Sequence, residues 1–540
     1  MGGPAASRTR GGTVAVRWLL LVLALVLVTG CTGGGGSDAP GSSGGSGGGG
    51  ALRGRSGGTL AIALLDPGRL DPARADGLED EVVLDNLFDG LTSIDPSGAV
   101  RPAVAASWSS DPDLRRWAFR LREDARWSDG SPVRPSDFIF AWHRLADPRT
   151  RPRPPARTLL AGVTGYRSFA DGRARSITGL TAPDPTSLVV QLDQPFADFP
   201  AVVASLPLSP LPTAVARPDP AAYLARPIGN GPFRLAAPAR PGRSLTLDRN
   251  PTYSGSPALL DKVSVDVVPD EQTAWLELQN GQVSFAPVPP DQLAAARTVH
   301  GPSPDGRSAP GLLQGPTLTT WNLAFNLKSK LGRDPRWRQA VSLAVDRDRL
   351  AATLAGSPAT TVVPPATPDA DGNSGGAAPS CTACTHDPAK ARSLLARTKP
   401  ADTPATLAIP RGAEARALAA VLTKDLATAG IKLAPDPTPP GETPVTLVRG
   451  FAPYPRPDPL LAAPASASPS AERLLDEARA TADNPARAAL YRQTETQVLA
   501  DLTATPLVTE HQAAVLIPGP QGFNLTPWNT LDLAAISLPA

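Results

Sequence analysis

A pair of cysteines three residues apart offers the most reactive side chains of the chain. The stretch "CTACTH" places Cys381 and Cys384 close to His386. Thiols at this spacing either close a local disulfide or, as thiolates, bind a metal ion. A zinc site needs further ligands, and the chain has only four histidines and no second CxxC motif. The sequence therefore predicts no metal site, and it favours a disulfide if the chain leaves the cytoplasm.

Motifs for hydrolysis are missing from the sequence. There is no H-E-x-x-H, which would supply zinc ligands and a base, and no Ser-x-x-Lys in the body of the chain. The pattern G-x-S-x-G occurs around Ser43 and Ser46, but it lies in a Gly/Ser run that cannot form the strand and helix of a nucleophile elbow. No glycine-rich loop with a lysine is present to hold phosphate. The sequence predicts a protein that is not an enzyme and has no cofactor.

The N-terminus has the plan of a secretory signal. Arg8, Arg10 and Arg17 precede an apolar run from Trp18 to Val28, and "VTGC" follows. The run is shorter than the roughly 20 apolar residues that a comfortable bilayer crossing takes. The four residues that end at Cys31 resemble a bacterial lipoprotein box, which implies cleavage after residue 30 and a diacylglycerol thioether on Cys31. The alternative is an uncleaved membrane anchor.

Residues 31–56 form a Gly/Ser-rich linker that is typical of a flexible tether. A lipid on Cys31 would hold the body of the protein at the outer face of the cytoplasmic membrane. The predicted localisation is therefore extracytoplasmic and lipid-anchored, in contact with the outer leaflet. In such a compartment we expect Cys381 and Cys384 to form a disulfide.

The composition of the body excludes several classes of partner. The formal net charge of the whole chain is +2, and acids and bases are interspersed. No block of like charge indicates nucleic acid. The roughly 480 residues that follow the linker are enough for two or three domains. Beyond the signal, no apolar stretch of the sequence is long enough to span a membrane.

Hydrophobic periodicity indicates a mixture of strands and helices in separate stretches. Alternating apolar residues predict strands at 57–66, 115–123, 187–195, 244–251 and 261–270. Helices are predicted from a capping residue followed by proline, at Asp334-Pro335, Asp387-Pro388 and Asn484-Pro485. In the last helix the predicted core stripe contains Tyr491, Glu495, Val498, Leu499 and Leu502. The longest internal loop is expected from Val363 to Ser380. These elements indicate an α/β body of several lobes.

A cluster of aromatic residues lies between residues 117 and 142, in a chain that is only 5% aromatic. Asp129 and Gly130 predict a turn between a strand and a helix, with Ser136 or Asp137 as the helix cap. We expect the cluster to fill a core, although Trp127 offers a ring that a ligand could stack on. The cluster consists of Trp117, Phe119, Trp127, Phe138 and Trp142, with Ile139 beside them.

The order of these segments resembles the family 5 extracellular solute-binding proteins, which are receptors of peptide, nickel and related ABC importers. The similar segments are "GGTL", "LFDGL", "RPAVAASW", "FRLREDARWSDGSPVRPSDFIFAW", "IGNGPFRL", "LDRNPTY", "LELQNGQVSFAPV", "LAFNLKS" and "DPRWRQAVSLAVDRDRL". They follow one another in family order and cover nearly everything from Gly57 to the C-terminus.

The resemblance implies an α/β, two-lobed periplasmic-binding-protein-like fold (type II, cluster C) with an extra small lobe in the N-terminal half. Lobe I is expected at 57–315 and 505–540, with the small lobe at about 86–185, and lobe II at 316–504. The implied function is that of a monomeric substrate-binding lipoprotein. It would capture a peptide or peptide-like solute between the lobes and deliver it to a membrane permease with partner ATPase subunits.

Alternatives to peptide import stay open at this point. Relatives of the family bind nickel chelates, oligosaccharides and haem, so the ligand is not fixed. A non-transport sensing lipoprotein on the same fold is a second class. An extracytoplasmic peptide hydrolase is a third, although the chain shows no candidate set of catalytic groups.

One segment departs from the family pattern. Peptide-binding relatives carry an acid in a "W-x-A-D-Y-x-x-P" segment that pairs with the ammonium of the peptide. Here the corresponding piece is "VRGFAPYPRPDPLL" at 448–461, with Pro453 where the acid would stand. Asp458 is the nearest acid, and Arg449 would suit a carboxylate if it faces inward. The predicted ligand-binding residues are Arg449, Phe451, Tyr454 and Asp458.

Overall fold

A computed structural model of the chain describes residues 56–539, except residues 69, 76, 217–222, 225, 370–380, 397–404 and 440–441. The predicted signal peptide (1–30), the predicted lipid site Cys31 and the predicted linker up to residue 55 lie outside the described residues. So does most of the predicted loop Val363–Ser380.

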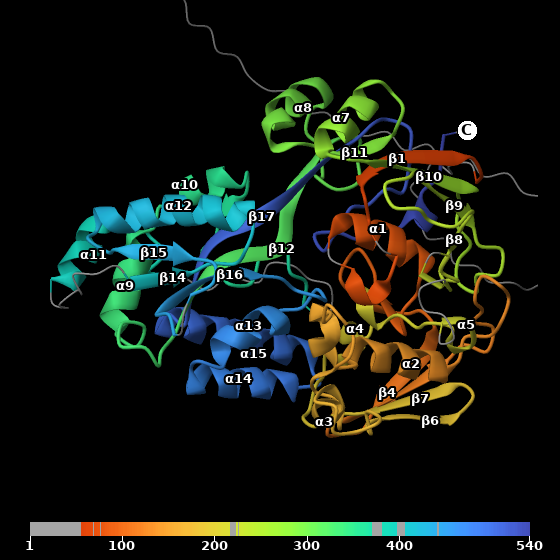
Figure 1. Cartoon of the computed structure of the whole chain (residues 1–540), viewed down its shortest axis with the longest axis horizontal. Coiled ribbons are helices and arrows are strands. Elements are labelled where there is room, and N and C mark those ends of the chain that lie inside the picture. The colour runs from red at the N-terminus through yellow and green to blue at the C-terminus, as the bar shows by residue number, and fades with distance from the viewer. Residues whose placement is uncertain are drawn as a thin grey trace, which may run out of the picture. The chain divides into compact units, whose positions relative to one another are not determined.

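One mixed sheet runs through the described part of the chain, in the order β15-β14-β16-β12-β17-β11-β1-β10-β9-β8, with β13 paired to β17 off this path (Figure 1). The pairs β1·β10, β1·β11, β14·β15 and β14·β16 are parallel, and the others are antiparallel. The strands are β1 (Thr59–Leu65), β8 (Phe233–Leu235), β9 (Leu245–Arg249), β10 (Lys262–Val268), β11 (Phe285–Pro287), β12 (Gly311–Phe325), β13 (Ser357–Pro358), β14 (Ala405–Ala408), β15 (Leu433–Asp436), β16 (Val445–Gly450) and β17 (Ala504–Leu516).

Two long strands, β12 and β17, join the two ends of this sheet. Residues 311–316 of β12 pair with residues 511–516 of β17, and β17 continues there onto β11. After a register shift between Pro316 and Thr320, residues 320–324 pair with 504–509, and β12 continues there onto β16. One half of each strand therefore belongs to the part of the sheet that contains β1, which we call the β1 side, and the other half belongs to the part that contains β14, the β14 side.

A smaller sheet of four antiparallel strands, in the order β4-β5-β7-β6, lies in the N-terminal half. Its strands are β4 (Ala105–Ser110), β5 (Arg116–Leu121), β6 (Leu180–Asp184) and β7 (Ser187–Gln191), and a short pair β2 (Thr92–Ile94) and β3 (Val100–Pro102) precedes it. The aromatic cluster belongs to this region. Trp117, Phe119, Trp127, Phe138 and Trp142 are all buried, so the core interpretation is confirmed. The predicted cap, Ser136 or Asp137, is wrong: α2 begins at Pro135 after the N-cap Arg134, and Asp137, in the first turn, accepts the backbone N–H of Arg134 at 2.9 Å.

The helices pack against the sheets and against one another. They are α1 (Leu78–Leu87), α2 (Pro135–Ala146), α3 (Tyr166–Ala170), α4 (Phe199–Val202), α5 (Thr213–Ala216), α7 (Glu271–Gln279), α8 (Leu293–His300), α9 (Pro335–Ala344), α10 (Arg347–Thr353), α11 (Pro388–Leu395), α12 (Ala413–Thr428), α13 (Asp458–Ala465), α14 (Pro469–Arg479) and α15 (Asn484–Asp501). Asp334 and Asp387 cap α9 and α11 with their side chains, as predicted.

Two further helix boundaries differ from the prediction. The cap of α15 is Asp483, whose carboxylate accepts the backbone N–H of Ala486, and Asn484 is the first helical residue. The helix predicted from Asp334 to Leu350 is two helices, because the chain is extended at Val345 and Asp346 caps α10. The predicted stripe of α15, from Tyr491 to Leu502, is buried, as expected.

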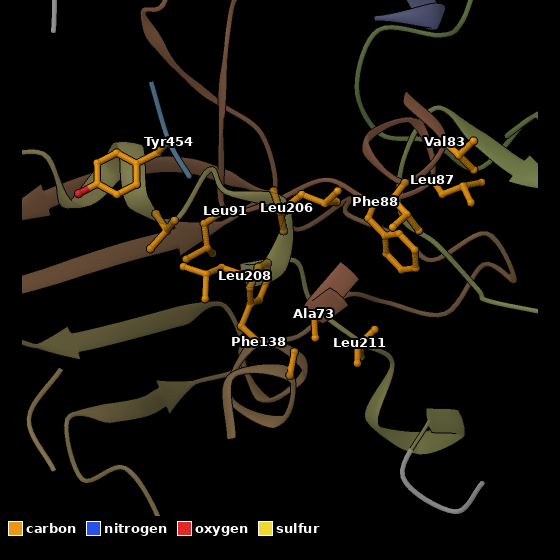
Figure 2. Packing of buried hydrophobic residues seen from close by; sticks show 14 of the residues in the cluster. Ala73, Val83, Leu87, Phe88, Leu91, Phe138, Leu206, Leu208, Leu211 and Tyr454 are labelled. Carbon is orange, nitrogen blue, oxygen red and sulfur yellow. The ribbon is translucent and has the colours of Figure 1, made fainter. Parts of the chain in front are cut away.

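The largest hydrophobic cluster is made by segments far apart in the chain. It joins β1, α1 and the small sheet to the C-terminal residues Phe523, Leu525, Leu531 and Ile536. Figure 2 shows part of it, with Tyr454 at the edge of the group that contains Leu91 and Leu206. A separate cluster holds β12, β14 and β16 against α9, α10 and α12, and another holds α13, α14 and α15 together. Tyr454 thus packs with the core of the N-terminal half.

The segment "IGNGPFRL" fixes the end of α1. The N–H of Gly231 donates to the carbonyl of Leu87 at 2.9 Å, and the side chain of Asn230 bonds the backbone of Asp89 at both its N–H and its carbonyl. A Cβ atom at Gly229 would lie 1.9 Å from the carbonyl oxygen of Leu87, so only glycine fits. These contacts hold α1 and its acidic residues in place.

Candidate functional site

A cavity of about 1720 Å³ lies between the N-terminal half and the segment that follows β16. Its walls come from three parts of the chain. The N-terminal half supplies Asp85, Asp89, Arg122, Arg126, Phe199, Ser205 and Tyr253, the C-terminal segment supplies Thr526, Trp528 and Asp532, and the opposite wall is Phe451–Pro455 with Asp458, Pro459, Ala462 and Arg479. Binding cavities for small molecules measure about 300–1,000 Å³, so this one has room for a larger solute.

The wall that follows β16 contains three of the four predicted ligand-binding residues. Phe451 is 50% exposed and presents its ring to the cavity, whereas Tyr454 and Asp458 line it while being largely buried. Pro453 also lines the cavity, and its carbonyl accepts the hydroxyl of Ser205 at 3.1 Å. Pro453, expected at the position of the acid in peptide-binding relatives, therefore lies in the cavity wall.

Asp458 is a paired acid. Its Oδ1 accepts Nε–H of Arg479 at 2.7 Å, and its Oδ2 accepts the hydroxyl of Tyr454 at 3.2 Å. Burial raises the pKa of Asp458 above its ordinary value, and Arg479 opposes that shift. At this point the cavity wall presents an ion pair and a hydroxyl. These groups suit the amide and carboxylate groups of a ligand better than they suit a lone ammonium.

Arg449 lies apart from the other three predicted residues. It is not among the residues that line the cavity. Its Nε and Nη2 each donate to the carboxylate of Glu510 at 2.7 Å, and Glu510 also accepts the indole N–H of Trp321 at 2.7 Å. The structure thus places Arg449 against β17 and β12, where its guanidinium fork is occupied by a protein carboxylate.

Three acids, Asp85, Asp89 and Asp532, line the cavity on the side formed by the N-terminal half and the C-terminal segment. We call this group the acidic pole, and it was not among the predicted site residues. Asp85 lies in the last turn of α1, Asp89 lies two residues after the helix ends, and Asp532 comes from the C-terminal segment. Burial is the main cause that raises the pKa of Asp85 and of Asp89 to about 7, and mutual repulsion adds to it. Asp89 also accepts the hydroxyl of Tyr253 at 2.8 Å.

The spacing of these acids is only a partial signal for the pole. Glu81 and Asp85 are four residues apart and lie on one face of α1, but Asp89 follows the end of the helix. A helix face of acids is usually solvated, so the spacing alone does not indicate a cavity wall. Asp532, 443 residues after Asp89, carries no sequence signal that links it to α1.

The cysteine pair lies away from the cavity. Cys381 and Cys384 are joined in a disulfide in the structure. Among the described residues, no group of three or more His, Cys, Asp or Glu side chains is arranged to hold a metal ion. None of the helices in the described part combines the length and the apolar character that a bilayer crossing needs.

The fold and cavity are those of a solute-binding protein, and the sequence comparison agrees. The family described as bacterial extracellular solute-binding proteins, family 5 (middle part), matches residues 99–472, and the chain belongs to this family. The predictions of the family and of the two-lobed α/β fold are confirmed. The members of this family are binding proteins rather than enzymes.

Two proteins of Escherichia coli (strain K12) are among the similar curated sequences. The periplasmic murein peptide-binding protein MppA is 30% identical over 287 residues, which is 52% of this chain and 51% of MppA. The probable deoxycholate-binding periplasmic protein YgiS is 31% identical over 314 residues, 56% of either chain. The chain spans about half the length of the curated relatives it matches.

Solved structures show the same fold over a longer span. The unliganded open form of MppA superposes with a TM-score of 0.71 at 24% identity, and covers 89% of this chain and 97% of its own. The clavulanic acid biosynthesis oligopeptide binding protein 2 gives a TM-score of 0.75 at 23% identity, over 90% of this chain and 96% of its own.

Proposed function

We propose that the chain is the substrate-binding lipoprotein of an ABC importer and that it captures peptides or a peptide-like solute in the cavity. The observation that carries this proposal is the size and position of the cavity, whose walls come from both sides of the β12–β17 crossing. Relatives support a peptide ligand, since one is a murein peptide-binding protein and another, OppA of Haemophilus influenzae, was solved with the peptide RPPGFSPFR.

The sheet supports the proposed division into lobes. We assign lobe I to 57–315 and 505–540, with the small lobe at about 86–185, and lobe II to 316–504. The register shift after Pro316 supports a boundary inside β12. A ligand that touches both walls favours the closed state only by the difference between its affinities for the closed and the open state. The closed form, a monomer, would then be recognised by the permease, whose ATPase partner supplies the energy.

Within the cavity we assign ligand contact to Phe451, Tyr454 and Asp458. Phe451 offers an exposed ring to an apolar group, and the Tyr454–Asp458–Arg479 group offers donors and acceptors to a peptide backbone. Arg449 contacts a ligand only if its pair with Glu510 opens. Waters in so large a cavity let side chains of different size be accepted.

The anchor is part of the proposal. Cleavage before Cys31 and lipidation of its thiol would tether the body to the outer leaflet, outside the cytoplasm. Mass spectrometry of the mature chain tests this, because the lipidated N-terminus carries a mass that Cys31→Ser removes. A mature chain that begins elsewhere contradicts the anchor and leaves the receptor proposal standing.

The receptor proposal is tested by native mass spectrometry of the protein as purified, followed by identification of any released solute. The expected result is a retained peptide or peptide-like molecule, with retention reduced in Phe451→Ala. A protein that hydrolyses a peptide panel, or that shows no binding to peptides in fluorescence titrations after refolding without ligand, would overturn it.

A further inference from the structure

A buried ionic cluster joins the two sides of the cavity. Asp198, the residue before α4 in the N-terminal half, accepts the hydroxyl of Tyr491 at 2.8 Å. The same carboxylate lies 3.2 Å from Nε of Arg487 and 3.7 Å from Nε of Arg456. Tyr491 and Arg487 belong to α15, and Arg456 lies just before α13. All four side chains are buried, so α13–α15 bind the N-terminal half through charges that water does not screen.

Hydrogen bonds to backbone groups lie around this cluster and join the same two parts of the chain. The N–H of Ala197 donates to the carbonyl of Arg479 at 2.8 Å. Nη1 of Arg456 donates to the carbonyl of Gly98 at 3.0 Å. Together with the bond from Ser205 to Pro453 and the packing of Tyr454 in the core of the N-terminal half, they form one continuous contact. Figure 1 shows α4 beside the ends of α13 and α15.

The cluster lies at the edge of the cavity. Phe199, the first residue of α4, and Ser205, three residues after its end, line the cavity, and so do Pro455 and Asp458, on either side of Arg456. Burial is the main cause of the raised pKa of Asp458, and the charge of Asp198 adds to it. The charges of the cavity wall and of the cluster therefore interact, so a change of charge in one alters the electrostatic environment of the other.

The chemistry of the cluster favours an all-or-none contact. The carboxylate of Asp198 faces two guanidinium groups, and Asp369 lies close enough to Arg456 to attract it. Among the described residues, Nε and Nη2 of Arg456 have no hydrogen-bond partner. A buried ion pair contributes little net stability compared with apolar packing, but separating its members is costly. Such a contact stabilises the docked arrangement and stabilises partly separated arrangements poorly.

We propose that Asp198, Arg456, Arg487 and Tyr491 form a latch that closes one edge of the cavity when α13–α15 dock on the N-terminal half. The latch rests on the proposed function for its role in ligand exchange, because opening the cavity at this edge requires these contacts to separate. It regulates how often the ligand-free protein opens, and hence how fast ligands enter and leave.

Hydrogen exchange of the full-length, ligand-free protein tests the latch. The amide of Ala197 reports directly on docking, since its acceptor lies across the contact. Tyr491→Phe removes one bond to a charged group and keeps every charge, so exchange at Ala197 is expected to rise about ten-fold, and more in Asp198→Asn. Amides of β1 serve as the internal reference, because they exchange only through wider unfolding.

Asp425→Asn is the matched control. Asp425 is also buried and accepts Nη1 of Arg349 at 2.6 Å, but both residues lie on the β14 side of the sheet. It should leave exchange at Ala197 unchanged relative to β1. Unchanged exchange in both Tyr491→Phe and Asp198→Asn, or an equal rise at β1, would overturn the latch. Because Tyr491→Phe keeps the charges, it decides the matter even if Asp198→Asn does not fold. A chain that opens as expected but retains no solute would defeat the receptor proposal and leave the latch standing.

Discussion

Arg479 and Asp458 form a close ion pair in the wall of the cavity, with Nε of the arginine 2.7 Å from Oδ1 of the carboxylate. The acid that the sequence offers as a substitute for the family residue at Pro453 is therefore already neutralised by the protein. A ligand ammonium that approached Asp458 would have to compete with Arg479.

Arg479→Ala should destabilise the protein. It leaves the carboxylate of Asp458 buried with only Tyr454 as a partner. The expected loss is about 2–3 kcal/mol, below the full cost of breaking a buried pair, because the side chain of Arg479 is partly exposed. Denaturant unfolding measures it. Arg473→Ala, on the exposed face of the same helix, is the control, and equal losses in the two variants would contradict the argument.

Arg449→Ala should have a small effect on stability and none on ligand retention. Its pair with Glu510 is well exposed on the arginine side, and such pairs contribute about 0–1 kcal/mol. Phe451→Ala, two residues on and inside the cavity, should lower retention instead. Native mass spectra of the two variants check this, and a loss of ligand in Arg449→Ala would place that residue in the site.

Substitution of two tryptophans should have different effects, one mainly on stability and the other mainly on ligand binding. Trp127→Ala removes a fully buried ring and is expected to cost about 3–5 kcal/mol, with ligand binding retained by the folded fraction. Trp528→Ala removes a partly buried ring that lines the cavity, so binding should weaken more than stability. Thermal unfolding and ligand titration of both variants distinguish a core ring from a contact ring. Weakened binding with normal stability in Trp127→Ala would reverse the assignment.

Gly229→Ala should be poorly tolerated. The added methyl group would overlap the carbonyl oxygen of Leu87, and its three nearest atoms all belong to the backbone of Leu87, which cannot turn aside. We expect a loss of more than about 2 kcal/mol, or no soluble protein, from overpacking at the end of α1. Gly242→Ala is a useful comparison in the same half, because nothing lies within 4 Å of its added Cβ and the cost there comes only from its positive φ. Similar losses at both positions would show that conformational strain, not overlap, governs this segment.

The acidic pole should make stability depend on pH near neutrality. The pKa of Asp85 is raised to about 7 in the folded state, so folding favours its protonated form. Its contribution to stability is complete below pH 4 and is lost as pH rises through about 7. Asp85→Asn, which stays neutral, should therefore be more stable than the parent at pH 8, by about 1–2 kcal/mol, and nearly equal to it at pH 4. Unfolding at the two pH values measures the difference, and an advantage that appears at pH 4 instead would contradict the sign.

Local signals in the sequence accounted for much of the fold. The Asp-Pro starts of α9 and α11, the alternating strands and the stripe of α15 depend on neighbouring residues, and all are confirmed. The break between α9 and α10 was missed because Asp346, a second cap, lies inside an otherwise helical apolar pattern.

The site was predicted less completely, for a physical reason. Phe451, Tyr454 and Asp458, which line the cavity, could be singled out because one continuous segment carries them, and their contact with a ligand stays a prediction. The partners of the cavity wall come from across the fold: Asp532 meets α1, and Asp198 meets residues nearly 300 positions later. Pairing over such separations depends on how the lobes close, and periodicity within a segment does not encode it.

The last residues of the chain complete the hydrophobic cluster that the first strand begins. Phe523, Leu525 and Ile536 pack with β1 and α1, and the side chain of Asn86 donates to the carbonyl of Leu531 at 2.8 Å. During synthesis the N-terminal half therefore lacks part of its interior until residues 523–536 have been made. Until then, apolar side chains of β1 and α1 lack neighbours that the folded protein supplies.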